Sequence, residues 1–253
     1  MAEQKRKQRW RSVRNIGLII VAIVGVIVVL SLRSGDDKKP VSATSSSSSA
    51  PAPVAITIPA AGASVTGDTA CPAADGSSAR TTTFEKAPPM CIDAAKTYVA
   101  SVETSKGTFT IALDAKSAPN TVNNFVVLSR YHYFDGVAFH RIIPDFVDQV
   151  GDATGPTPGQ GGPGYTIPDE LPTGATPYPE GAVAMANNST PNTSGSQWFI
   201  VIGTGGSSLA PSYNLLGTIS SGLEVAKTIN AAGTQSGTPT EAIVITKVTI
   251  TES

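Results

Sequence analysis

The sequence predicts a mainly β fold: a closed antiparallel barrel of eight strands capped by two α-helices, preceded by an N-terminal transmembrane helix and a flexible linker. Glycine (24) and proline (19) are abundant and helical periodicity is scarce, which is typical of β-rich folds with many turns. Hydrophobic residues make up 40% of the chain, enough for one core. The 253 residues allow one ordinary domain with appendages.

The first residues carry the signal of a membrane anchor. Residues 1–14 hold six Lys or Arg, and 16–32 is a run of 17 residues without charge. A helix needs about 17–25 apolar residues to cross a bilayer. We therefore predict a single-pass signal-anchor helix over 15–33 in the cell membrane, with the basic tail in the cytoplasm and the rest of the chain outside it. A cleaved secretory signal is the alternative.

The remainder of the chain is acidic. Residues 40–253 hold nine Lys or Arg against 16 Asp or Glu, although the net charge of the whole chain is −1. Nucleic-acid binding depends on basic side chains that neutralise phosphates. We therefore expect no nucleic-acid partner.

Two segments connect the anchor to the globular pattern. Residues 34–61 form a linker rich in Ser, Ala and Pro, a composition that cannot offset the entropy lost on ordering. Residues 62–95 contain Cys71 and Cys91, the two cysteines of the chain. Outside the cytoplasm such a pair favours a disulfide, worth roughly 3 kcal/mol for a loop of this length. A metal pair or two free thiols are the alternatives, but two ligands without nearby histidine make a poor zinc site.

The globular domain is predicted over 96–253. Pro119 suits the first turn of a helix over 118–131, and a second helix is predicted over 223–232. Strands are predicted from alternating or continuous apolar runs, and the run at 197–203 is apolar enough to be buried on both faces. The predicted strands are 98–104, 109–114, 137–143, 146–151, 182–187, 197–203, 214–220 and 243–251.

The segment 137–152 has the most informative side chains. Alternation over 137–143 predicts a strand with Phe139 and Arg141 on one face and Ile142 on the other. Arg141, Phe146 and Gln149 follow within nine residues. A fixed guanidinium, an aromatic wall and an amide that both donates and accepts suit a neutral ligand rich in carbonyl groups.

Each of these residues also has a purely structural interpretation. A strand arginine is usually solvated or ion-paired, and a lone phenylalanine usually belongs to the core. His140 lies between bulky residues, which favours a packing histidine with satisfied hydrogen bonds over a catalytic base.

Most cofactor and covalent chemistry is poorly supported. The chain has two histidines, His132 and His140, and lacks both the G-x-S-x-G of serine hydrolases and a dinucleotide fingerprint that opens a helix. The Gly- and Pro-rich stretch 151–172 lacks the Lys-Ser/Thr that completes a phosphate-binding loop. We expect no cofactor and no metal.

Five motifs nevertheless occur in a specific order: F-H-R-I-I-P-x-F-x-x-Q-x-G-D, G-Q-G-G-P-G-Y, M-A-N, P-N-T-S-G-S-Q-W-F-I and L-L-G. Their order and spacing over about 96–251 resemble the cyclophilin family of peptidyl-prolyl cis–trans isomerases. The chain looks most like the membrane-anchored or exported cyclophilins of high-GC Gram-positive bacteria, which also carry a Cys-containing segment before the barrel.

The resemblance implies a site on the outside of the barrel, with Arg141 as the catalytic residue. Asp145 departs from the family pattern, which often has Gly there, and Asp148 varies it too. Tyr213 stands where many members have histidine. The implied substrate-binding residues are Phe146, Val147, Gln149, Ala186, Asn187, Gln197, Phe199, Leu209 and Tyr213.

The implied function is isomerisation of X-Pro bonds during folding of extracytoplasmic proteins. The expected partners are proline-containing polypeptides, together with the membrane through the N-terminal helix, and the protein is expected to be monomeric. Two alternatives are a cell-envelope module or chaperone that binds proline segments without turnover, and a purely structural envelope protein. The intact polar set around Arg141 argues against the structural role.

Overall fold

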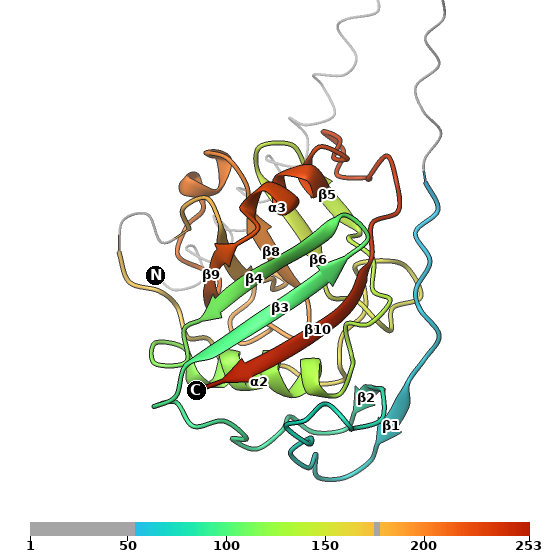
Figure 1. The fold of residues 1–253 in the computed structure, drawn as a ribbon, viewed down its shortest axis with the longest axis vertical. Helices are drawn as coiled ribbons and strands as arrows, with labels where there is room; N and C mark the ends of the chain where they lie inside the picture. Colours follow the sequence, from blue (N-terminus) through green and yellow to red (C-terminus); the bar gives the residue numbers. More distant parts are fainter. Residues whose placement is uncertain (1–53, 175–177) are drawn as a thin grey trace, which may run out of the picture. The chain divides into compact units, whose positions relative to one another are not determined.

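A computed structural model describes residues 54–174 and 178–253. Its centre is one antiparallel sheet of eight strands in the order β10-β3-β4-β9-β7-β8-β6-β5. Helices α2 and α3 lie at opposite ends of this sheet (Figure 1). The eight strands are β3 (Tyr98–Thr104), β4 (Gly107–Leu113), β5 (Arg141–Ile143), β6 (Val147–Val150), β7 (Ala182–Met185), β8 (Trp198–Val201), β9 (Leu215–Ser221) and β10 (Ile245–Glu252).

The sheet closes only in part. Its edge strands, β10 and β5, do not pair along their length; an isolated bridge joins Ala138 to Val244. Two further backbone hydrogen bonds flank the bridge, from Phe139 N to Ile243 O and from Ile245 N to Val137 O. The expected closed barrel is therefore an eight-stranded antiparallel sheet whose edges are joined by one short stretch.

The strand predicted at 137–143 is mostly wrong. Only β5 is a regular strand, because the preceding residues make just the isolated bridge. The predicted separation of faces also fails, since Phe139 and Ile142 are both fully buried in the main core. Short-range alternation does not fix side-chain direction where the backbone leaves the ladder. The run at 197–203, by contrast, contains β8, all four residues of which are buried as predicted.

Both predicted helices are present. Helix α2 (Pro119–Arg130) begins with proline and has no capping side chain at Ala118. Its free N–H groups are instead bonded by a distant carboxylate: Glu170 Oε1 accepts from Asn120 N at 3.0 Å, and Oε2 accepts from Thr121 N at 2.8 Å. Helix α3 (Leu223–Asn230) begins after Gly222.

Aromatic rings fill the space between the sheet and α2. Trp198 is fully buried, and its ring makes edge contacts with those of Phe125, Phe134 and Phe139 at centroid distances of 5.8, 6.3 and 6.4 Å. Such contacts add to the large apolar area that each ring buries. This core fixes the inner face of β8, whose next residue, Phe199, belongs to a second cluster on the outer face.

The extension before the globular domain is more ordered than its sequence indicates. Strands β1 (Ala63–Val65) and β2 (Thr81–Phe84) form a small parallel sheet. The predicted disulfide is confirmed: Cys71 and Cys91 are bonded with Cα atoms 5.4 Å apart. The extension also packs on the main domain, since Phe84 is buried in the main core and its N–H donates to Pro163 O.

The predicted transmembrane helix at 15–33 lies outside the described residues, as do the basic tail and most of the linker. Within the described ranges, neither α2 nor α3 has the length and apolarity to cross a bilayer.

Candidate active site

A small cavity on the outer face of the sheet collects nine of the ten residues implied by the family resemblance. Its volume is about 190 Å³, below the roughly 300–1,000 Å³ of sites for drug-sized ligands. It therefore suits one side chain rather than a whole small molecule. We call it the proline pocket, lined by Arg141, Phe146, Val147, Gln149, Ala186, Asn187, Phe199, Leu209 and Tyr213.

The sheet register brings these residues together from distant parts of the chain. Arg141 on β5 is the cross-strand partner of Gln149 on β6, and Gln149 is the partner of Phe199 on β8. Between β5 and β6 the chain turns at Asp145, whose φ of 56° is left-handed. Aspartate tolerates this conformation better than most residues, so it can replace the glycine that the family often has there.

Arg141 offers its guanidinium to the pocket. The side chain is partly buried, and Nη1 donates to Gln149 Oε1 at 3.3 Å. No ion pair within the described ranges includes Arg141. Gly237 packs against its aliphatic part, because a Cβ there would lie 3.1 Å from Arg141 Cγ. The ion-paired alternative does not apply, and the donors remain available for a ligand.

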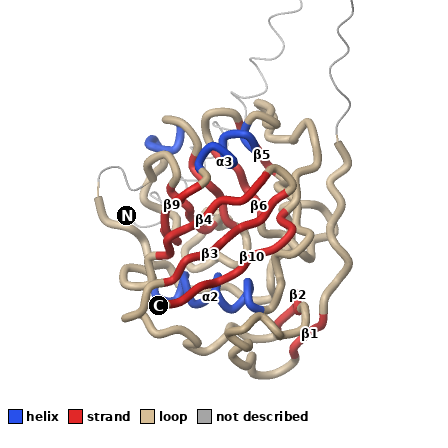
Figure 2. Tube along the Cα trace, in the orientation of Figure 1, coloured by secondary structure: helices blue, strands red, loops and turns tan. Residues whose placement is uncertain are grey.

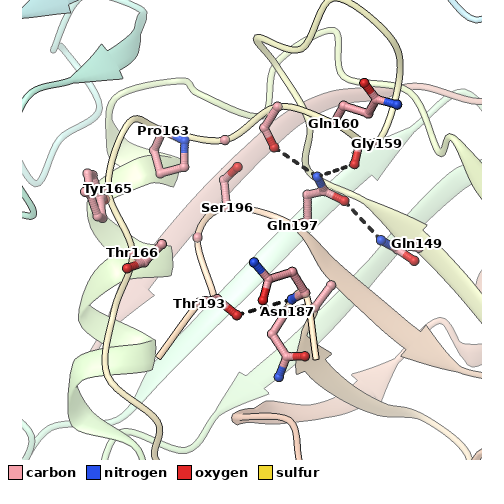
Figure 3. Close-up of a pocket in the computed structure, with 15 residues that line it drawn as sticks. Gln149, Gly159, Gln160, Pro163, Tyr165, Thr166, Asn187, Thr193, Ser196 and Gln197 are labelled. Atoms are coloured by element: carbon pink, nitrogen blue, oxygen red, sulfur yellow. Dashed lines mark hydrogen bonds between the residues drawn. The ribbon is translucent and has the colours of Figure 1, made fainter. Parts of the chain in front are cut away.

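A chain of amides holds this arginine in place through Gln149, and Figure 3 shows the part of the chain that runs from Gln149 through Gln197. Gln149 Nε2 donates to Gln197 Oε1 at 3.0 Å. Gln197 Nε2 in turn donates to the carbonyl oxygens of Gly159 and Gly161, each at 2.9 Å. Gln197 thus lies outside the proline pocket and acts on Arg141 only through Gln149.

Gln197 instead lines a larger neighbouring cavity of about 460 Å³. We call it the Gln197 pocket; it shares Gln149, Ala186 and Asn187 with the proline pocket. Its wall is built from amide side chains, hydroxyls and the glycine-rich backbone of 159–162, and it contains no charged side chain.

Asp152 organises that glycine-rich backbone, a role that the sequence reasoning missed. Between β6 and β7 the described chain is a long loop (Figure 2). The buried Asp152 carboxylate accepts four hydrogen bonds from this loop, from the N–H groups of Thr154, Gly155, Gly159 and Gly161. Burial alone would raise the pKa of Asp152, but these four bonds outweigh it and lower that pKa. The signal for this role is the Gly-Asp that directly follows β6 and precedes repeated glycines.

Aromatic rings form the far wall of the proline pocket. Phe199 and Tyr213 meet edge to face with centroids 5.3 Å apart. The buried Tyr178 fixes the Tyr213 backbone, since its hydroxyl donates to Tyr213 O at 2.6 Å and accepts from Tyr213 N at 2.9 Å. Tyr213, which replaces the family's frequent histidine, is therefore part of a rigid apolar wall.

Asn187 leaves its backbone available. Its side chain is engaged: Nδ2 donates to Ser212 O at 2.8 Å, and Oδ1 accepts from Ser189 N. Neither its N–H nor its C=O bonds to another described residue. This free peptide, two residues beyond the end of β7, can pair with an extended ligand as a strand edge does.

Two titratable residues of the central segment lie outside the proline pocket. His140 is mostly buried, which lowers its pKa to about 4 and keeps it neutral at physiological pH. Its Nδ1 is buried and finds no hydrogen-bond partner among the described residues, so His140 packs as predicted but without the predicted hydrogen bonds. Asp148 is fully buried, and burial raises its pKa to about 7. It points away from the groove, and its Oδ1 accepts from Asn230 of α3.

Comparisons with known proteins agree on one family. A family model described as "Cyclophilin type peptidyl-prolyl cis-trans isomerase/CLD" matches residues 99–250. A peptidyl-prolyl cis-trans isomerase of Arabidopsis thaliana is 40% identical over 136 residues, covering 53% of this chain and 80% of that protein. One from Schizosaccharomyces pombe is 39% identical over 144 residues, covering 53% of this chain and 86% of that protein.

Solved structures agree as well. A cyclophilin-type isomerase of Cryptosporidium parvum has a TM-score of 0.56 and 28% identity, covering 62% of this chain and 99% of that one. A second crystal structure of that protein was determined in the presence of the dipeptide Ala-Pro. Because the family match extends over more than half of the sequence and the relatives are covered over most of their length, the chain belongs to the cyclophilin-type peptidyl-prolyl cis–trans isomerases.

Proposed function

We propose that Arg141 accelerates X-Pro isomerisation by stabilising the twisted peptide bond without a covalent intermediate. Rotation about a peptide bond faces a barrier of about 18–20 kcal/mol, because resonance gives the C–N bond double-bond character. The two planar forms of an X-Pro bond differ by only about 0.5–1 kcal/mol. The catalyst must therefore lower the barrier rather than shift the equilibrium.

The twisted state differs from both planar states in its hydrogen-bonding groups. When resonance is lost, the proline nitrogen regains its lone pair and becomes a better acceptor. A guanidinium fixed at the edge of the pocket can donate to this nitrogen or to the rotating carbonyl oxygen. Since these bonds are strongest in the twisted form, they lower the barrier. The observation that carries this proposal is the Arg141 guanidinium, which forms no ion pair with any described residue and is held in the pocket by Gln149.

The surrounding pocket supports this role by fixing the substrate. Phe146, Val147, Phe199 and Leu209 supply an apolar hollow for the proline ring, and the free backbone of Asn187 can hold the flanking peptide. Pre-positioned groups that exclude water act more strongly on developing charge. The relative determined in the presence of Ala-Pro supports a proline-containing peptide as substrate.

Exchange spectroscopy on an Ala-Pro peptide tests catalysis directly. We expect substoichiometric full-length protein to produce cis–trans exchange peaks at mixing times far shorter than the uncatalysed tens of seconds. The slow proline-limited phase of a refolding protein is expected to accelerate in parallel. The alternative module that only binds proline segments would shift the peptide resonances without exchange peaks and would leave the slow refolding phase unchanged.

We further propose that this isomerase acts outside the cytoplasm and is tethered through residues 15–33. The apolar run with its basic flank and the Cys71–Cys91 disulfide both support this, because such bonds persist in oxidising compartments. We expect the full chain to resist alkaline extraction from membranes and to be digested by protease added to cells stripped of their wall. A variant that lacks residues 1–33 is expected to become extractable. Recovery of the unmodified chain in the soluble fraction would contradict the anchor.

A further inference from the structure

A third cavity, of about 350 Å³, adjoins the proline pocket. It shares Asn187, Leu209 and Tyr213 with the proline pocket, and it lies on the flank away from the Gln197 pocket, with which it has only Asn187 in common. We call it the Asp169 pocket, lined by Asp169, Leu171, Asn187, Ser189, Thr190, Pro191, Leu209, Ala210, Ser212 and Tyr213.

Hydrogen bonds between three loop segments hold the Asp169 pocket together. The three segments are 169–171, 187–191 and 209–213. Asn187 Nδ2 donates to Ser212 O at 2.8 Å and joins the second segment to the third. The first segment is held by Asp169 N, which donates to Asn192 Oδ1 at 2.8 Å, and by Glu170 N, which donates to Asn214 Oδ1 at 2.8 Å next to β9. The cavity is therefore part of the folded framework.

Asp169 is the only charged side chain in this pocket, and its charge is not compensated. No ion pair or side-chain hydrogen bond to its carboxylate occurs within the described ranges. Its Oδ1 is buried and has no hydrogen-bond partner there. The adjacent Glu170 differs, because both of its carboxylate oxygens accept hydrogen bonds from N–H groups at the N-terminus of α2. A partly buried carboxylate without a partner favours a cation from outside.

Part of the lining of the Asp169 pocket is apolar. Leu171 is 46% exposed, and Leu209, Ala210 and Pro191 line the same cavity, together with hydroxyl and amide side chains. A lysine or arginine side chain matches this combination, because its methylene stem packs on apolar surface while its charged end reaches a carboxylate. An acidic side chain would be repelled, and a short polar one would leave the walls unfilled.

We propose that the Asp169 pocket is a specificity subsite that selects substrates with a basic residue near the isomerised proline. This inference rests on the proposed function, since it takes the proline pocket as the place where the X-Pro bond sits. Because the two cavities share Leu209 and Tyr213, a peptide that leaves the proline pocket on this side enters the cavity that Asp169 lines. The Gln197 pocket on the other flank carries no charge, so selection by charge is confined to one side of the proline.

A peptide series tests this proposal with the full-length protein. Each peptide carries one X-Pro bond and a single Lys, Leu or Glu at one position from three before to three after the proline. We expect kcat/KM from exchange spectroscopy to favour Lys over Glu by about 10-fold at positions on one side only, a ratio typical of a partly buried charge pair. This preference is expected to shrink as salt is raised.

Three variants identify Asp169 as the cause. Asp169→Asn is expected to bring the Lys/Glu ratio close to one while leaving the rate for the Leu peptide within about two-fold. Asp169→Lys is expected to reverse the preference. Glu103→Gln, at an exposed position of β3 outside the three pockets, is the matched control and should keep the preference. Thermal melts of all three confirm folding.

The outcomes separate this inference from the proposed function. If no peptide in the series undergoes accelerated exchange, the isomerase assignment fails. If all peptides are isomerised with equal kcat/KM, or if Asp169→Asn keeps the lysine preference, the isomerase assignment stands and the subsite is refuted.

Discussion

Arg141→Ala is expected to lower kcat/KM for an Ala-Pro peptide by about 10²–10³-fold, the loss typical when one donor to a developing charge is removed. The side chain forms one hydrogen bond, to Gln149, and no ion pair within the described ranges. Its removal should therefore change the free energy of unfolding by less than about 1 kcal/mol. Exchange spectroscopy and chemical denaturation measure the two effects separately.

Arg130→Ala is the matched control for this experiment. Arg130 is a buried arginine, with 7% of its side chain exposed, and its Nη2 lies 2.8 Å from Glu252 Oε2, outside the three pockets. Its loss is expected to lower the free energy of unfolding by about 1–3 kcal/mol while kcat/KM stays the same. If instead Arg141→Ala loses stability and activity in parallel, Arg141 is a structural residue and the proposed mechanism is wrong.

The free energy of unfolding of Asp148→Asn is expected to exceed that of the parent protein by an amount that grows with pH. Asp148 is fully buried on β6, and its Oδ2 has no hydrogen-bond partner among the described residues. Burial raises its pKa to about 7, although the hydrogen bond from Asn230 favours the charged form. In an unfolded chain the pKa of an aspartate is about 3.9.

The sign of the effect follows from these two values. Between about pH 4 and pH 7 the folded state holds a proton on Asp148 that the unfolded state has lost, so Asp148 destabilises the fold increasingly as pH rises. Above pH 7 both states are ionised and the penalty is constant. A shift of this size corresponds to at most on the order of 4 kcal/mol. Asp148→Asn should match the parent near pH 4 and exceed its stability by a few kcal/mol at pH 8.

Only the difference between the two proteins isolates Asp148. His140 acts in the opposite direction, because its pKa is lowered to about 4 by burial and the fold therefore gains stability as pH rises toward the unfolded value of about 6.5. The parent protein can thus show a nearly flat profile over this window. Urea denaturation at half-unit pH steps on both proteins gives the difference. A difference that does not change between pH 4 and pH 8 would show that Asp148 is not buried as a neutral acid.

Local sequence patterns predicted most of the regular elements. Strand β3 occupies the predicted residues, both helices begin within one residue of the prediction, and β8 is buried on both faces. The failure at 137–143 has a physical cause: Phe139 and Ile142 both reach the main core, because the backbone between them leaves the regular ladder. Partners for that stretch come from residues 243–245, and a local pattern contains no information about so distant a segment.

The sequence by itself determined the kind of protein. The order of its motifs identified the family, and the positions of those motifs predicted the nine residues that line the proline pocket. Only the tertiary structure decided how those residues are supported and what lies beside them. The hydrogen bonds of Gln197 to the glycine-rich loop, the cap that Glu170 supplies to α2, and the place of Asp169 in one pocket with Leu209 all depend on contacts between residues far apart in the chain. Periodicity and composition indicate whether a residue prefers solvent or the core, and which backbone conformation it favours. Contacts between distant residues depend instead on how the strands pair and where the loops between them cross.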